Sequence, residues 1–120
     1  MTPTETVIAF IDAWNARDWD GIEALFTEDV IYHNIPMEPL HGREVAMAGI
    51  RAMQPKMVDW QVLNIAANGN VVLTERVDDF VMADDKKVSV PVMGTMEIRD
   101  GKICAWRDYF DLATFTSQMA

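Results

Sequence analysis

The back half of the chain alternates between apolar and polar residues over four successive stretches, with short turns between them. The turn signals fall at residues 68–69, 84–86 and 99–101, and each contains glycine or aspartate. A period of two is typical of strands with one buried face, and turns this short join antiparallel neighbours. The four expected strands cover residues 58–66, 71–82, 88–98 and 103–110. The pattern therefore predicts a meandering antiparallel sheet.

The front half of the chain has mainly helical character. Thr2 and Glu5 have the spacing of a capping box around Pro3, and apolar residues then recur at helix spacing up to residue 15. The other expected elements are a short helix capped by Asp18 and carrying Ile22, Leu25 and Phe26, a strand over 30–35, a helix over 42–53 and a terminal helix capped by Asp111. The inward residues of the helix over 42–53 are expected to be Val45, Ile50 and Met53. Helices followed by a meander predict an α+β fold, with the helices covering one face of the sheet.

Size and charge exclude several classes of protein. The 120 residues suit one domain over residues 1–120, and a 50% apolar content is enough for a core. A formal net charge of −9 argues against binding to nucleic acid or to anionic membrane surfaces. The single cysteine, Cys104, excludes an internal disulfide, and no secretory signal or membrane-spanning run is visible. We therefore expect one cytoplasmic globular domain.

Charged residues interrupt the apolar face of the expected sheet. Arg76 and Asp78 alternate with apolar residues in the strand over 71–82, and Asp108 lies in the last strand. If both later turns contain three residues, Asp78 and Asp108 both lie opposite Val92, one on each neighbouring strand. The two aspartates are then two strands apart, with roughly 10 Å between their backbones. Arg76 is then close enough to bridge the two carboxylates. Such charges are costly on a buried face unless they satisfy one another.

This cluster has a catalytic and a structural interpretation. An arginine between two carboxylates can push their pKa values apart, so that one acts as an acid and the other as a base. Tyr32 and Asn34 share a face of their strand, where they can add hydrogen bonds that fix a water. Buried Asp–Arg–Asp networks are also frequent as structural elements. The pattern alone selects neither interpretation and no substrate.

The surroundings of the cluster are expected to be apolar. An apolar cup with a few converging polar groups suits a small lipophilic ligand. His33 and His41 lack the spacing of a metal site, so no zinc site is expected. The side chains that share the face of the cluster by alternation, and so form the expected pocket wall, are Trp60, Phe80, Val90, Val92 and Phe110.

Four segments of this sequence resemble the limonene-1,2-epoxide hydrolase family. They are residues 32–36, 74–78, 101–103 and 106–112, and the resemblance covers nearly the whole chain in order, including Gly94. It implies a curved, cone-like mixed sheet, largely antiparallel, with helices packed on its concave side. Folds of this kind are called SnoaL-like or nuclear-transport-factor-2-like.

The resemblance also implies an activity and the residues that carry it. Asp108, helped by Tyr32 and Asn34, takes a proton from water, Asp78 protonates the departing oxygen, and Arg76 bridges the two carboxylates. The implied reaction converts a small lipophilic epoxide and water to a vicinal diol in one step, without metal or cofactor, in a homodimer. Two alternatives remain open: a ketosteroid-isomerase-like or polyketide-cyclase-like enzyme of the same fold, and a non-catalytic binding or dimerisation module.

Overall fold

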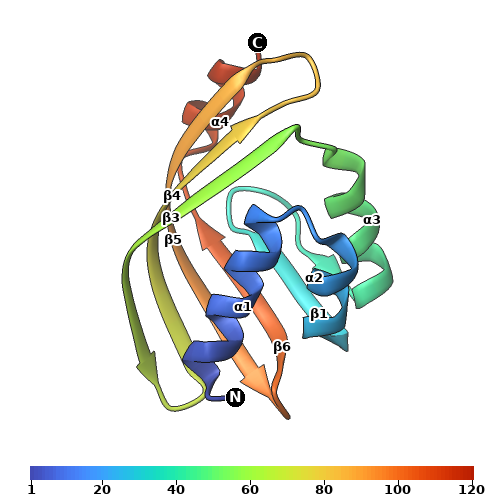
Figure 1. Cartoon of the computed structure of the whole chain (residues 1–120), viewed down its shortest axis with the longest axis vertical. Coiled ribbons are helices and arrows are strands. Elements are labelled where there is room, and N and C mark those ends of the chain that lie inside the picture. Colours follow the sequence, from blue (N-terminus) through green and yellow to red (C-terminus); the bar gives the residue numbers. More distant parts are fainter.

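The computed structural model describes residues 1–120 as one six-stranded sheet with four helices (Figure 1). The strands are β1 (Phe26–Asn34), β2 (Leu40–His41), β3 (Met57–Asn68), β4 (Val71–Val81), β5 (Lys87–Arg99) and β6 (Lys102–Tyr109). The helices are α1 (Pro3–Asn15), α2 (Trp19–Leu25), α3 (Arg43–Met53) and α4 (Leu112–Met119). None of the helices combines the length and apolar character needed to span a bilayer.

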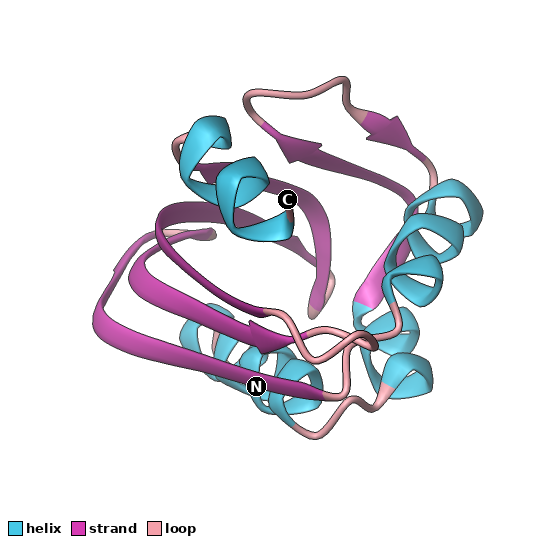
Figure 2. Cartoon of the chain, turned by 90° about the horizontal axis from the view of Figure 1, so that it is seen from above, coloured by secondary structure: helices cyan, strands magenta, loops and turns pink.

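The sheet is mixed and strongly curved. Its strand order is β2-β1-β6-β5-β4-β3, and all neighbours are antiparallel except β1 and β6. Figure 2 shows the sheet bending around the space in which the helices lie. The α+β class and the curved sheet with helices on its concave side are therefore confirmed.

Helix α1 begins and packs as its sequence predicts. The Thr2 hydroxyl accepts from the Glu5 amide at 3.1 Å, and the Glu5 carboxylate accepts from the Thr2 amide at 2.9 Å. This capping box satisfies two of the N–H groups that a helix start leaves unpaired. The buried stripe of the helix then meets the sheet, where Phe10 contacts Trp106 edge-on at 4.8 Å between ring centroids.

Two local expectations are wrong. Phe26 belongs to β1 and not to α2, because its backbone is extended and it pairs with Ile103 of β6. Val45 is 50% exposed, whereas Ile50 is buried. Two positions five residues apart on an α-helix differ by about 140°, so Val45 and Ile50 cannot both face the sheet. Ala46 and Met47 take the inward positions instead.

The pairing of β4 with β5 differs from the expected register. Asp78 lies opposite Val90 and not opposite Val92. The turn closes one residue earlier than expected, at residues 83–85, and Asp85 takes the left-handed φ of 70°. Moving a hairpin turn by one residue shifts the pairing by two, so Asp78 stays on the concave face.

The pairing of β5 with β6 departs from expectation twice. Asp108 lies opposite Gly94 and not Val92, because the turn contains only residues 100–101 and a bulge follows at residues 97–98. The short turn alone would put Asp108 on the convex face, and the bulge returns it to the concave one. Asp78 and Asp108 therefore lie on the same face of the sheet, but they are opposite different residues of β5, Val90 and Gly94.

Candidate active site

An apolar cavity of about 450 Å³ lies between the concave face of the sheet and the helices α1, α3 and α4. The five residues expected in its wall all line it: Trp60, Phe80, Val90, Val92 and Phe110. The polar side chains in the lining are Tyr32, Asn34, Asp78 and Asp108. Four of the five predicted site residues thus reach the cavity, whereas Arg76 lies behind the two carboxylates.

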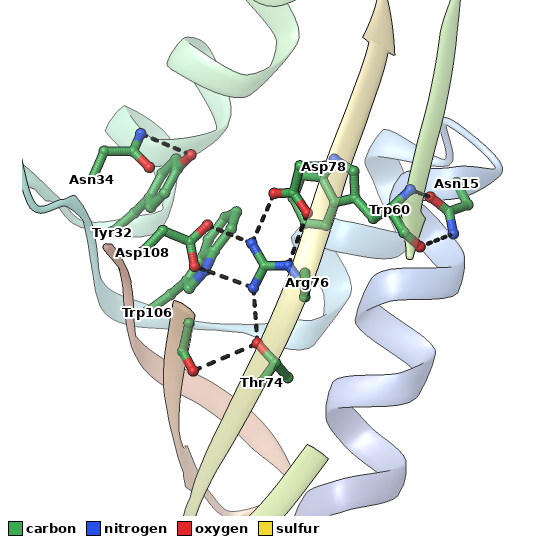
Figure 3. A network of polar contacts seen from close by, with 10 residues as sticks. Asn15, Tyr32, Asn34, Trp60, Thr74, Arg76, Asp78, Trp106 and Asp108 are labelled. Carbon is green, nitrogen blue, oxygen red and sulfur yellow. Dashed lines mark hydrogen bonds and ion pairs between the residues drawn. The ribbon is translucent and has the colours of Figure 1, made fainter. Parts of the chain in front are cut away.

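Arg76 uses all of its N–H groups in this network. Its Nε and Nη2 donate to Asp78 at 3.0 and 2.8 Å, and its Nη1 and Nη2 donate to Asp108 at 3.2 and 2.8 Å. The second Nη1 hydrogen goes to the Thr74 hydroxyl at 3.0 Å. Figure 3 shows the two carboxylates on opposite sides of the guanidinium. Because five donors find five acceptors, the buried charge is fully hydrogen-bonded.

Neighbouring strands bring these groups together from distant parts of the chain. Thr74, Arg76 and Asp78 are alternate residues of β4, so their side chains lie in a row on the concave face. Asp108 comes from β6, and Gly94 of β5 lies between Asp108 and Thr74 in the pairing. Arg76 therefore extends over β5 at the one position in that strand's concave face without a side chain.

The ring of Trp60 lies against the guanidinium of Arg76. The Cζ of Arg76 lies 4.8 Å from the ring centroid of Trp60, within range of a cation–π contact. Asn15 fixes Trp60 through two hydrogen bonds: its Oδ1 accepts from the Trp60 amide at 2.8 Å, and its Nδ2 donates to the Trp60 carbonyl at 3.2 Å. The end of α1 therefore holds the strand that carries the ring (Figure 3).

The two carboxylates have different surroundings. Asp108 accepts three N–H groups, two from Arg76 and one from the Trp106 indole at 2.8 Å. Asp78 accepts only two, both from Arg76. Hydrogen bonds from N–H donors favour the ionised form of a carboxylate. The geometry therefore favours Asp108 as the carboxylate and Asp78 as the carboxyl that takes a proton.

The protonation of Asp78 and Arg76 follows from burial and charge. Burial raises the pKa of Asp78 to about 6, against the opposing pull of the Arg76 hydrogen bonds and charge. Burial alone would lower the pKa of Arg76, but Asp108 and Asp78 raise it above its usual value. The arginine is thus permanently charged, while Asp78 exchanges its proton near neutral pH.

Tyr32 and Asn34 lie beside Asp108 because β1 runs parallel to β6. This pairing places Asn34 next to Asp108 and Tyr32 next to Trp106, on whose ring the Tyr32 ring stacks at 4.0 Å. The Asn34 amide donates to the Tyr32 hydroxyl at 3.0 Å. Burial raises the pKa of Tyr32, so the phenol stays neutral and keeps its proton as a donor. The amide oxygen of Asn34 remains available as an acceptor.

Sequence reasoning missed several residues of this site. Trp106 precedes Asp108 by two positions, so alternation within one strand was enough to place its indole on the same face. Thr74 was visible in the same way beside Arg76. For α3, helix spacing already predicts that Ile50 and Met53 face inward, although it does not assign them to the cavity, whereas α4 carries no comparable signal. The further lining residues include Trp14 of α1, Ile50 and Met53 of α3, Met82 after β4, and Phe115 and Met119 of α4.

A curved mixed sheet with helices and an apolar cavity on its concave side defines the SnoaL-like, or nuclear-transport-factor-2-like, class of folds. A structure of this class, a SnoaL-like polyketide cyclase described as putative, from Shewanella denitrificans, superimposes with a TM-score of 0.86. The alignment covers 98% of this chain and 96% of that one at 12% identity, so the likeness concerns the fold alone.

The chain belongs to the limonene-1,2-epoxide hydrolase family, whose catalytic-domain model matches residues 1–120. An epoxide hydrolase of Mycobacterium tuberculosis, EphG, is 34% identical over 107 residues, which cover 88% of this chain and 71% of that protein. The structure of an M. tuberculosis LEH-like epoxide hydrolase superimposes with a TM-score of 0.86 at 31% identity, covering 97% of this chain and 87% of that one.

Proposed function

We propose that this protein is an epoxide hydrolase that adds water to a small lipophilic epoxide in one step and releases a vicinal diol. The observation that carries the proposal is the Asp78–Arg76–Asp108 network at the polar end of an otherwise apolar cavity. An acid and a base held on the two sides of one guanidinium can act on a neutral ligand together. Membership of the family and the names of the two M. tuberculosis relatives support the same activity.

Asp108 is the proposed base. Its Oδ1 accepts two hydrogen bonds, from Arg76 and Trp106, whereas its Oδ2 accepts only one. Oδ2 therefore has an electron pair left for a proton of the attacking water. Tyr32 and Asn34 supply a donor and an acceptor beside it, which orient that water. The water oxygen forms a bond to one epoxide carbon as its proton passes to Asp108.

Asp78 is the proposed acid. As the bond between the epoxide carbon and oxygen breaks, the proton of Asp78 passes to that oxygen and the second hydroxyl of the diol is formed. Asp108 is then protonated and Asp78 ionised, and transfer of one proton restores the starting state. General acids and bases each contribute roughly 10²–10⁴ in rate, so the pair supplies a large part of the acceleration.

The alternatives of the same fold make different use of such a cavity. An isomerase or cyclase moves protons on carbon without adding water, and needs no guanidinium shared between two acids. A binding module needs neither an acid nor a base, and a buried ion network is a costly way to line its pocket. The Asp–Arg–Asp geometry therefore favours hydrolysis, and the product distinguishes the three.

The proposal predicts turnover of neutral cyclic and aryl epoxides in water labelled with heavy oxygen. With enzyme in excess over substrate, the first turnover should already place the label in the diol, because no oxygen of the protein is transferred. Label that appears only after later turnovers indicates a covalent ester intermediate and contradicts the one-step mechanism. Binding without any diol favours the module, and an isomerised carbonyl product favours the isomerase.

The same panel tests the apolar wall when it includes carboxylated epoxides of matching size. Phe80, Val90, Val92, Phe110 and Trp60 offer no partner for a charge, and an unpaired charge is costly to bury. We expect kcat/KM for the neutral member of each pair to be higher by at least about 100-fold. A preference for the charged member contradicts this wall.

The rate is expected to fall as the pH rises through about 6, the value to which burial raises the pKa of Asp78. The active form carries the proton on Asp78, so each pH unit above that value removes about nine-tenths of it. The measurement is kcat/KM for a neutral epoxide against pH, with the rate of Asp78→Asn subtracted as background. A rate that is flat or rising above this pH contradicts the role of Asp78.

The expected homodimer is part of the proposal. The convex face of the sheet carries exposed apolar side chains that a second copy would shield. These are Ile31, Leu73, Met93 and Tyr109, which are between 40% and 52% exposed.

The cytoplasmic location of the protein stays a prediction.

A further inference from the structure

The backbone of β5 passes directly beneath the guanidinium of Arg76 at Gly94. A Cβ built at this position would overlap Arg76 Nη1 and would lie 2.7 Å from Asp108 Oδ1 and 2.9 Å from Thr74 Oγ1. Gly94 does not have a positive φ, so the backbone conformation does not require glycine. Glycine inside a strand often marks the close approach of another group. Here the space that a side chain would fill is taken by Arg76 Nη1 and Asp108 Oδ1, which are hydrogen-bonded to each other.

Thr74 completes the same contact from β4. Its hydroxyl accepts the one guanidinium hydrogen that neither carboxylate takes, at 3.0 Å from Nη1. The Thr74 hydroxyl donates to the Gly94 carbonyl at 3.5 Å, so its oxygen lone pairs remain free to accept from Arg76. Thr74 is 1% exposed, so no solvent is available as an alternative acceptor. Loss of the hydroxyl would leave a buried N–H unpaired.

We propose that Gly94 and Thr74 form a seat that fixes the Arg76 guanidinium between the two carboxylates, and that both are positioning residues for the epoxide opening proposed above. Neither side chain lines the cavity, so neither is expected to touch the substrate. Both act through Arg76. The position in which they hold the guanidinium determines how strongly its positive charge interacts with Asp78 and with Asp108.

The division of that charge controls which carboxyl holds a proton. Burial raises the pKa of Asp78, the hydrogen bonds and charge of Arg76 lower it, and the charge of Asp108 raises it further. A methyl group at position 94 separates Nη1 from Asp108 and leaves the guanidinium to Asp78 alone. Asp78 is then held more firmly in its ionised form. The variant therefore lacks the acid, although both aspartates are still present.

The test compares Gly94→Ala with Thr95→Ala, the next residue of β5, whose side chain lies on the convex face. For Gly94→Ala we expect kcat to fall by about 100-fold and KM to change by less than about threefold, since the apolar wall is intact. Carboxyl-carbon NMR should show Asp78 titrating at a lower pH than in the wild type. Thr95→Ala should match the wild type in all three measurements.

A second pair of variants covers the case in which Gly94→Ala does not fold. Thr74→Val removes the acceptor at nearly constant volume and should lower kcat by about tenfold, whereas Thr74→Ser should restore most of that loss. Equal kcat values for Thr74→Val and Thr74→Ser contradict the seat.

The other outcomes distinguish a failure of the Gly94–Thr74 seat from a failure of the proposed epoxide hydrolysis. A folded Gly94→Ala that keeps the wild-type kcat, or that loses activity without any change in the Asp78 titration, overturns the seat. A wild-type protein that opens no epoxide contradicts the proposed function instead. In that case the Asp78 titration of Gly94→Ala still shows whether the glycine positions the arginine.

Discussion

Asp108→Asn is expected to lower kcat by about 10³-fold or more while the protein stays folded. The amide keeps the size of the carboxylate and can still accept hydrogen bonds through its oxygen, so Arg76 and Trp106 retain a partner. It has no negative charge with which to take a proton from water. Asp78→Asn should lose a similar factor for the opposite reason, because an amide cannot deliver a proton as a carboxylic acid does.

The two substitutions should not be additive. If water attack and oxygen protonation occur in one step, removing either group removes the step, and the double variant should resemble each single variant. The measurements are kcat and the thermal midpoint of each variant, with binding of a neutral diol as a test of cavity integrity. Asp59→Asn is the matched control, since Asp59 is an exposed residue of β3 and lies outside the cavity lining. An Asp108→Asn variant that folds and keeps most of its rate would place the base elsewhere.

Arg76→Lys is expected to impair both activity and stability. A lysine ammonium has three donors on one atom and cannot span two carboxylates as the guanidinium fork does. The buried carboxylates lose hydrogen bonds that they cannot replace from solvent, because Asp78 and Asp108 are each 4% exposed. Breaking a buried ion pair costs about 3–5 kcal/mol, and retention of a positive charge places the lysine variant near the lower end of that range.

The activity of Arg76→Lys should fall by at least about 100-fold, because the two carboxyls no longer share one fixed charge. Arg107→Lys is the matched control: Arg107 is on β6, pairs with Glu97 and has a side chain that is 31% exposed. Denaturant unfolding and kcat should both remain close to the wild type in that control. An Arg76→Lys variant with a rate within about tenfold of the wild type would mean that a fork is not required.

The elements that the sequence predicts best have local causes. The capping box of Thr2 and Glu5, and the caps at Asp18 and Asp111, depend on residues within three positions of one another. Register depends on details that composition does not determine. Asp84 and Asp85 are both good turn residues, and only the closed hairpin shows that Asp85 takes the left-handed conformation.

The candidate site shows the same division between local and distant causes. Alternation alone places Arg76 beside Asp78. Asp108 reaches the predicted face only because the bulge at residues 97–98 offsets the shorter turn. The position of Asn34 next to Asp108 requires a parallel pairing between strands more than seventy residues apart in the chain. Nothing in the alternation of either strand encodes that pairing. Alternation shows only that Tyr32 and Asn34 share a face and can hold a water, and the family resemblance is what implies that they assist Asp108.

The two hydrogen bonds between Asn15 and Trp60 have a consequence for solubility. β3 is the outermost strand on its side of the sheet, so its outward peptide groups are open to pairing with a strand of another molecule. The Asn15 amide occupies the N–H and the carbonyl of Trp60 as a neighbouring peptide would. At the opposite border, β2 has only two residues and offers little to pair with. One side chain at the end of α1 thus steadies the strand that carries the ring beside Arg76 and also blocks pairing with another molecule at this position of the edge.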